Sequence, residues 1–525
     1  MSAHSSSSSL IPSYTPEQSI PIVRRQSRRK SFLDYGGENS INNFASSVKR
    51  SVDFLSSSLG SATTPSENDL ITRTLSEDVP GSYATSFTER SPLLIDTTTS
   101  TPPINEEEAV ESSPFKDNAS SIAVEAGQPS LIVNIAKKST PMQTIFNSIN
   151  VLIGLGILSV PLALHLSGWI PGMICLLLAA LSTRYTAVLL GRILAKVHSL
   201  NTYQDIAVHV YGRSIGYFIL ATFSLDLYGA GVSMVIIFSD SFNALIPSLS
   251  PFVLKAILCT ILMVLNLLPL RFLSVLSLVG IFCTTCTFFI ILASGLWKST
   301  QPGSLLHSMP TNLFPSSFID FCFSLGLFLA PWGGHATFPE IYSDQKKPGK
   351  FSACMDISFS FCYAVDALTG IIGFLMFGRL TDSEVTRNIL LTPGYSTSVK
   401  TTIVTLMGLL PISKLPLVCR PITTAADNFH HPQRDGKCPL YKKIINRFLI
   451  SFVYFFSALF ITSFGKVMSL LGSAICFTVC ITLPVLFYLN VFRDELGRGH
   501  KLFLYVLAVV SVLCAIFGSV SVLLK

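Results

Sequence analysis

Glycine and proline interrupt the first long apolar segment of this 525-residue chain. The stretch INVLIGLGILSVP, residues 149–161, places Gly154 and Gly156 at its centre and Pro161 soon after them. Glycine weakens a helix by about 1 kcal/mol relative to alanine, and proline removes a backbone donor. In hydrocarbon an unpaired backbone group costs several kcal/mol. Such a break is therefore costly unless the freed backbone has a use.

A second segment, GLFLAPWGGHATFPEIY at residues 326–342, is interrupted by Pro331, Gly333 and Gly334. Two interrupted segments five spans apart indicate an inverted-repeat transporter with its site between the breaks. Half-helix N-termini offer N–H groups to a carboxylate, and freed carbonyls take an ammonium or a cation. A zwitterionic amino acid fits both ends of such a site. The alternative is that the glycines only permit close helix packing.

Ionisable side chains inside apolar segments are costly and therefore mark functional candidates. Asp226 lies in the third segment, and His335 and Glu340 follow the break in the sixth. These three are candidates for a proton relay, because burial moves such pKa values towards physiological pH. Lys414, in PISKLPL of the eighth segment, is predicted to replace a fixed cation beside the first break and to remove sodium dependence. The alternative is a lysine that snorkels to the membrane interface.

Other polar and sulfur-containing side chains favour structural roles. Arg184 and Asp366 form either a buried pair or separate polar anchors. All twelve cysteines lie at or after Cys175, mostly in apolar segments, where cysteine behaves as a small hydrophobe. The chain has no zinc-spaced ligands, no Gly-rich loop ending in Lys-Ser/Thr and no nucleophile–base constellation. We therefore expect no metal, no cofactor and no enzymatic activity.

The elements that position these residues are membrane helices. Hydrophobic residues make up 49% of the chain and charged residues only 13%, whereas a soluble domain carries about 25% charged residues. The charges crowd into the first 140 residues and a few loops. We expect an all-α polytopic membrane protein with about eleven helices of spanning length, at residues 144–166, 169–194, 215–245, 252–270, 272–297, 318–341, 353–377, 399–425, 444–462, 467–491 and 501–524.

Basic residues predict the orientation of these helices. With the N-terminus inside, the inner loops carry clusters such as Lys346–Lys347 and Lys442–Lys443, whereas the outer loops carry far fewer cations. The positive-inside rule then predicts a cytosolic N-terminus and, with eleven spans, a lumenal C-terminus. The net charge of +7 reflects this topology, and we expect no nucleic-acid binding.

Residues 1–140 are rich in Ser, Thr, Pro and Asn and are predicted to form a disordered cytosolic tail before a transport domain at 141–525. Within the tail, Glu89, Leu93 and Leu94 of ERSPLL fit the acidic dileucine pattern. Cytosolic sorting adaptors read such patterns on proteins bound for lysosomes or vacuoles. The motif is short, so the alternative is a chance match.

Several longer stretches resemble the amino acid/auxin permease family: TIFNSINVLIGLGILSVPLAL, TYQDIAVHVYG, PWGGHATFPEIYSDQKKPGKF, GFLMFGRL and PISKLPLVCRPI. Within it they are most similar to fungal vacuolar transporters of neutral amino acids, a branch that includes the vesicular inhibitory amino-acid transporter. The resemblance implies a sodium-symporter-like inverted-repeat core of five plus five helices, proton coupling and large neutral amino acids as substrates. The predicted substrate site comprises Asn147, Asn150, Ile153, Gly154, Leu155, Gly156, Tyr228, Gly333 and Gly334.

Together these features predict a transporter of the vacuolar membrane that exchanges lumenal protons for cytosolic neutral amino acids. Its partners would be amino acids, protons, vacuolar lipid and a sorting adaptor. One alternative is proton symport out of the vacuole. Another is an amino-acid-sensing transceptor with slight transport: on removal of residues 1–130 a sensor would lose its signal, whereas a pure transporter would keep its flux. A passive channel is disfavoured because the interrupted segments carry no charged ring or repeated filter.

Overall fold

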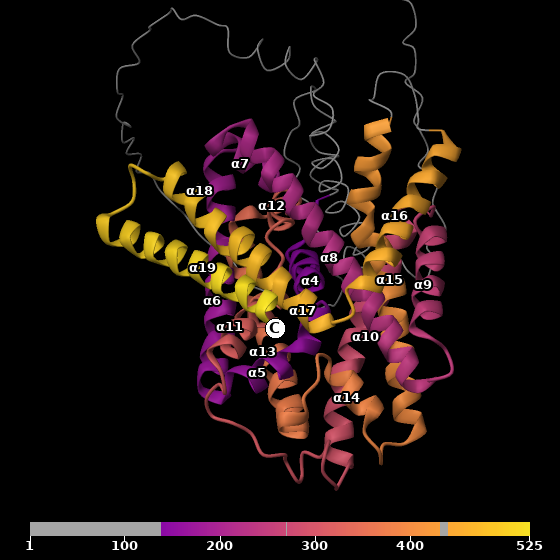
Figure 1. Cartoon of the computed structure of the whole chain (residues 1–525). Helices are drawn as coiled ribbons and strands as arrows, with labels where there is room; N and C mark the ends of the chain where they lie inside the picture. Colours follow the sequence, from indigo (N-terminus) through magenta and orange to yellow (C-terminus); the bar gives the residue numbers. More distant parts are fainter. Residues whose placement is uncertain (1–137, 269, 431–438) are drawn as a thin grey trace, which may run out of the picture.

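The computed structural model describes residues 138–268, 270–430 and 439–525, and every regular element in this part of the chain is helical (Figure 1). The sorting motif at Glu89, Leu93 and Leu94 lies outside the described residues, as do all but the last three residues of the expected tail. The first half contains α4 (Pro141–Leu152), η3 (Leu155–Ser159), α5 (Val160–Ser167), α6 (Trp169–Lys196), α7 (Tyr203–Tyr211), α8 (Arg213–Leu245), α9 (Pro251–Leu265) and α10 (Leu270–Trp297).

The second half begins with another interrupted helix. Its elements are α11 (Phe318–Leu329), η4 (Ala330–Trp332), α12 (Phe338–Ser343), η5 (Pro348–Lys350), α13 (Phe351–Phe377), η6 (Gly378–Leu380), α14 (Val385–Leu391), α15 (Thr397–His430), α16 (Leu440–Phe460), α17 (Phe464–Leu470), η7 (Leu471–Thr482), α18 (Leu483–Val491) and α19 (Arg498–Leu524). The element η7 is a π-helix, a form that is rare beyond a single turn.

Both breaks occur where the sequence predicts them. Thr140 caps α4 in a capping box with Gln143, and the helix ends at Leu152 because Gly154 adopts an extended conformation. The chain resumes as η3 and α5 at an angle of 45° to α4. In the sixth segment, α11 and η4 end at Trp332, and α12 begins only at Phe338.

The number of full-length spans differs from the expected eleven. Among the described residues, eight helices are long and apolar enough to cross a membrane, or nine if the bent first pair counts as one span. Two further apolar helices, Pro251–Leu265 and Phe318–Trp332, are shorter. The first is capped by Ser250, begins at Pro251 and ends before its C-cap, Asn266. The second stops at the Gly/Pro break, since its continuation α12 is a separate short helix.

Small residues let the central helices approach closely. A Cβ on Gly156 would lie 2.8 Å from the Pro331 nitrogen, so the two breaks lie directly against each other. Where α11 crosses η7, a Cβ on Gly472 would lie 1.8 Å from the carbonyl oxygen of Gly326. Backbone contact of this kind is typical of membrane helices, which associate mainly by packing.

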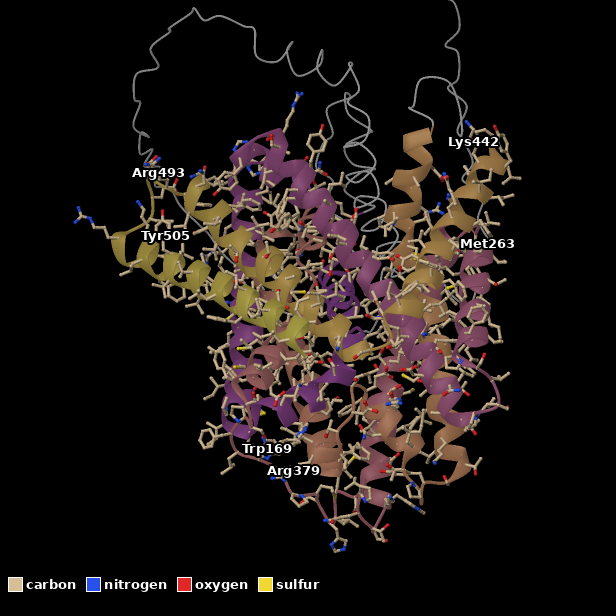
Figure 2. All side chains as sticks on the ribbon, in the orientation of Figure 1. Trp169, Met263, Arg379, Lys442, Arg493 and Tyr505 are labelled. Atoms are coloured by element: carbon tan, nitrogen blue, oxygen red, sulfur yellow. The ribbon has the colours of Figure 1, made fainter. Side chains whose placement is uncertain are left out.

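The outer helices turn apolar side chains away from this centre. On α16, Phe448, Phe452 and Phe456 are about half exposed and stack along one face. Figure 2 shows Tyr505 projecting outward from α19. It also places Lys442 and Arg493 at one end of the molecule and Trp169 and Arg379 at the other. Apolar sides between two polar ends are what a membrane-spanning protein requires.

Candidate functional site

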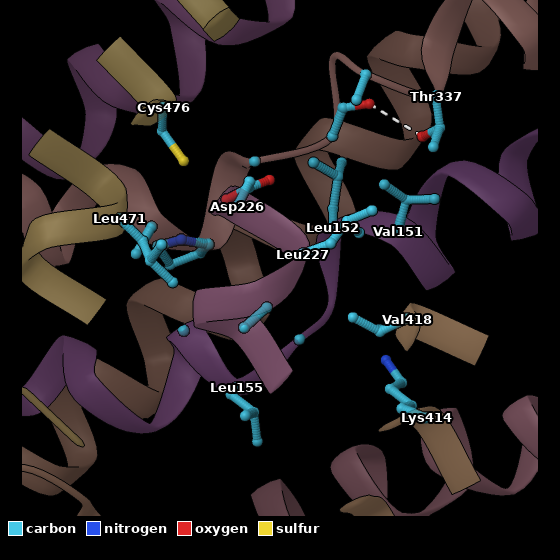
Figure 3. Close-up of a pocket in the computed structure, with 18 of the residues that line it drawn as sticks. Val151, Leu152, Leu155, Asp226, Leu227, Thr337, Lys414, Val418, Leu471 and Cys476 are labelled. Atoms are coloured by element: carbon cyan, nitrogen blue, oxygen red, sulfur yellow. Dashed lines mark hydrogen bonds between the residues drawn. The ribbon is translucent and has the colours of Figure 1, made fainter. Parts of the chain in front are cut away.

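A cavity of about 270 Å³ lies at the two breaks (Figure 3). Of the predicted substrate-site residues, seven line it: Asn147, Asn150, Gly154, Leu155, Gly156, Gly333 and Gly334. They come from α4, the first break and the second break, which lie more than 170 residues apart in the sequence. The cavity therefore lies where broken helices leave backbone groups outside regular hydrogen bonding.

Two predicted residues do not line this cavity. Ile153 is buried, and its carbonyl oxygen faces Lys414. The Tyr228 hydroxyl forms a hydrogen bond with Ser457 of α16, and its ring packs against Tyr454 with centroids 5.2 Å apart. Successive helical residues are rotated by about 100°. Asp226 and Ala230, about one helical turn apart, face the cavity together with Leu227, whereas Tyr228 is turned towards α16.

The two glycines of the first break have different surroundings. A Cβ on Gly156 would clash with the backbone of Pro331, so Gly156 permits close packing of the two breaks. A Cβ on Gly154 would meet no heavy atom within 4 Å. Gly154 therefore keeps the backbone accessible from the cavity and serves no packing contact. The close-packing alternative therefore holds for Gly156 and not for Gly154, and a role of Gly154 in ligand access stays a prediction.

Lys414 contacts the first break directly. Its Nζ donates to the carbonyl oxygen of Ile153 at 2.6 Å, and the residue is only 8% exposed. Gly280 of α10 makes room for the side chain, because a Cβ there would lie 2.7 Å from Lys414 Cγ. Ile153 is the C-cap of α4, so the ammonium sits at the negative end of that half-helix dipole. This geometry contradicts the snorkelling alternative.

No carboxylate pairs with Lys414 within the described part of the chain. Asp226 of α8 nevertheless also lines the cavity, as does Cys476 of η7 (Figure 3). The cavity thus carries one acidic and one basic side chain. Its remaining wall is largely apolar, with contributions from Phe223 and Val418 among others.

His335 lies behind the cavity and is fully buried. Its Nε2 is 3.0 Å from the carbonyl oxygen of Thr183 and 3.0 Å from the Thr186 hydroxyl. A carbonyl oxygen only accepts hydrogen bonds, so Nε2 carries a hydrogen, and Nδ1 holds the lone pair of the neutral ring. Among the described residues Nδ1 has no hydrogen-bond partner.

Glu340 and Arg184 lie away from the cavity. Glu340 is 1% exposed in α12, and its Oε2 has no hydrogen-bond partner among the described residues. The pairing of Arg184 with Asp366 is not formed: Arg184 binds Asp356, which lies nearer the start of α13, and both side chains are partly exposed. Of the four predicted coupling residues, only Asp226 and Lys414 line the cavity.

The contribution of η7 is not evident from the sequence. Its Cys476 lies 3.1 Å from where a Cβ of Gly333 would be. The Thr186 hydroxyl donates to the carbonyl oxygen of Cys480 at 2.6 Å, which connects η7 to the surroundings of His335. The only local signal is an apolar run with cysteines four residues apart, and this does not distinguish a π-helix from an α-helix.

The cavity extends towards one end of the molecule. Its lining includes Phe223 from the first half of α8 and Pro421 from the second half of α15, and these antiparallel halves lie towards the end that carries Lys442. At the opposite end α14 packs on η3 and α8, and its Val385 is fully buried against Gly373. α14 therefore covers the breaks from the end of the molecule opposite the start of α16 (Figure 1).

These features define a polytopic membrane protein with a small cavity between two broken helices. Residues 137–524 match the family of transmembrane amino acid transporter proteins, and the chain belongs to this family. It is an amino acid transporter and not an enzyme.

Similar proteins from a plant and a fish are also named as amino acid transporters. The chain is 30% identical to amino acid transporter AVT1C of Arabidopsis thaliana, over 75% of this chain and 71% of that one. It is 30% identical to AVT1I of the same plant, over 73% and 94% of the two chains. It is 23% identical to sodium-coupled neutral amino acid transporter 7 of Danio rerio, over 47% and 56%. Among solved structures, the nucleobase–cation symporter Mhp1 in a closed conformation with bromovinylhydantoin matches with a TM-score of 0.46 and 13% identity, over 74% and 92%.

Proposed function

We propose that this protein is a vacuolar secondary transporter that moves neutral amino acids from the cytosol into the vacuole in exchange for lumenal protons. The observation that carries the proposal is the cavity between the two breaks, with Asp226 in its otherwise largely apolar wall. Family membership supports amino acids as substrates. The motif resemblance to fungal vacuolar transporters supports the vacuolar membrane and proton exchange.

The cavity suits a single amino acid. Its volume of about 270 Å³ is slightly below the roughly 300–1,000 Å³ of most small-molecule pockets. The N–H groups at the start of η3, near Leu155, would bind the α-carboxylate, and the carbonyl end of α11, near Ala330, would bind the α-ammonium. Phe223, Leu227 and Val418 would receive an apolar side chain. This arrangement supports neutral amino acids over charged ones.

Asp226 provides a physical basis for exchange. When ionised, its carboxylate attracts the ammonium of the amino acid; when protonated, it loses that charge and the attraction with it. A proton and an amino acid would then compete for one group, which is what an exchanger needs. His335, with its free Nδ1, would pass the proton on from behind the cavity.

The position of Lys414 supports a transport cycle without a metal cation. Its ammonium occupies the carbonyl end of α4, at the first break, where a metal cation would otherwise be coordinated. We therefore propose that transport does not require sodium. The Lys/Arg-rich end that includes Lys442 and Arg493 faces the cytosol in this proposal, with the N-terminus, and the C-terminus faces the lumen.

Uptake into vacuolar membrane vesicles tests this function. Vesicles with and without the protein are given labelled neutral amino acids while ATP acidifies the lumen. We expect uptake that a protonophore abolishes. Asp226→Asn should lose the proton-dependent part, whereas Asp494→Asn, at an exposed position beyond α18, should not change it. Absence of uptake together with faster proton-driven loss from preloaded vesicles would instead establish symport out of the vacuole.

A further inference from the structure

The carboxyl group of Glu384 is buried on the α14 side of the breaks, opposite the end towards which the cavity extends. Glu384 is the N-cap of α14, and none of its surface is exposed. Neither carboxyl oxygen has a hydrogen-bond partner among the described residues. The adjacent Arg387 binds Asp382 and not Glu384. An ionised carboxylate without a partner is strongly disfavoured in such a place.

The neighbouring charges add to this effect. Burial raises the pKa of the Glu384 carboxyl well above its usual value, and the negative charges of Asp240 and Asp382 raise it further, against a smaller opposing effect of Arg387. Asp240 comes from α8, on which α14 packs. Of the other neighbouring elements, η3 has no titratable side chain, and Lys400 of α15 and Lys466 of α17 are partly or fully exposed and do not contribute to the shifted pKa of Glu384.

The position of Glu384 connects its protonation state to access. α14 covers the first break from this side, and Val385, the residue next to Glu384, is fully buried against Gly373 of α13. Ionisation of Glu384 would favour water around its carboxylate and so would favour movement of α14 away from η3. A proton on Glu384 removes the negative charge, so α14 remains packed on η3.

We propose that Glu384 is a proton-binding site on the lumenal face and that its proton holds α14 closed over the broken helices. The ligand is a proton and not a metal ion, because no group of three or more His, Cys, Asp or Glu side chains in the described chain has metal-binding geometry. The lumenal assignment rests on the orientation in the proposed function. The closed state is favoured below the raised pKa of Glu384 and is lost as the lumenal pH rises through it.

Cysteine labelling tests the proposal in the full-length protein. Val385→Cys places a thiol under α14, and Ser398→Cys provides an exposed thiol at the same end. Both are labelled with a membrane-impermeant maleimide supplied to the lumenal face at about pH 5.5 and about pH 7.5. Labelling of the parent protein is first subtracted from both labelling rates. The rate for Val385→Cys is then divided by the rate for Ser398→Cys, which removes the pH dependence of the reagent itself.

With Glu384 present, we expect the relative labelling rate of Val385→Cys to rise with pH, by up to about tenfold per pH unit for one titrating proton. Adding Glu384→Gln, which cannot ionise, should keep the rate low at both pH values. A pH-independent ratio with Glu384 present, or an unchanged pH response in Glu384→Gln, would overturn the proposal. Asp240→Asn is a second variant, expected to reduce the rate at pH 7.5 without abolishing the response. Labelling needs no amino-acid flux, so its outcome is independent of the uptake experiment.

Discussion

The single residues of the first break have separable roles that substitution can distinguish. Gly154→Ala should leave stability unchanged or raise it by about 0.4–1 kcal/mol, because its φ of −125° suits alanine and its Cβ would meet open space. The added methyl group should nevertheless weaken amino-acid binding, since it projects towards the cavity. The measurement is the melting temperature of the purified protein together with the KM for uptake.

Gly156→Ala is the matched comparison. Its Cβ would press on the backbone of Pro331, and we expect a loss of about 1–3 kcal/mol in stability, as for overpacking of a core. A stable Gly156→Ala protein, or a Gly154→Ala protein with normal KM, would contradict this assignment of packing to one glycine and ligand access to the other.

Removing the Lys414 ammonium should leave the carbonyl oxygen of Ile153 without its donor. We expect Lys414→Ala to transport amino acids only when sodium is present, because a sodium ion would then occupy the carbonyl end of α4. The measurement is uptake in sodium and in choline media. The control is Lys298→Ala, which removes the lysine directly after α10. Transport by this variant should remain independent of sodium. Unchanged transport in Lys414→Ala would refute the substitution of a fixed ammonium for a metal cation.

At the scale of helices, the crossing of α11 and η7 depends on two glycines. A Cβ on Gly472 would lie 1.8 Å from the Gly326 carbonyl oxygen, so the helices must separate to admit Gly472→Ala. We expect a loss of more than about 3 kcal/mol, visible as loss of the monodisperse protein in detergent on size-exclusion chromatography. Gly497→Ala is the control, since a Cβ there meets nothing within 4 Å. Equal yields of the two variants would contradict the close crossing.

Helices could be predicted from the sequence where local chemistry determines them. Gly154 and Pro331 mark both breaks because they act on their own backbone. The lengths of α9 and α11 were less predictable, because hydropathy does not show where Asn266 or Trp332 ends a helix. The π-helical form of η7 depends on packing against distant segments, and an apolar run alone does not specify it.

For the molecule as a whole, the closed α14 side and the position of the cavity predict the face from which the site is reached. Asn150→Cys should be labelled by an impermeant reagent from the cytosolic face and protected by a transported amino acid. Ser398→Cys should be labelled only from the opposite face. The measurement is labelling of intact and of inverted vesicles. Labelling of both thiols from one face would contradict the orientation.

Contacts between distant residues were the least predictable feature. The inverted-repeat pattern predicts Lys414 beside the first break. The sequence does not show that its aliphatic side chain fits there only because Gly280 has no side chain. Arg184 contacts Asp356, whereas Asp366 was the only partner considered from the sequence. Glu384 lies in a short polar stretch where exposure is the ordinary expectation, and only the fold shows that it is buried.

A lysine in place of a dissociable metal ion also affects the electrical work of each cycle. The charge of Lys414 stays with the protein, so it transfers no net charge between compartments. Exchange of one proton for one neutral amino acid then moves one elementary charge across the membrane. A membrane potential of 100 mV contributes about 2.3 kcal/mol for each such charge. Accumulation should therefore respond to voltage as well as to pH, and a potassium diffusion potential at equal pH should drive uptake by itself.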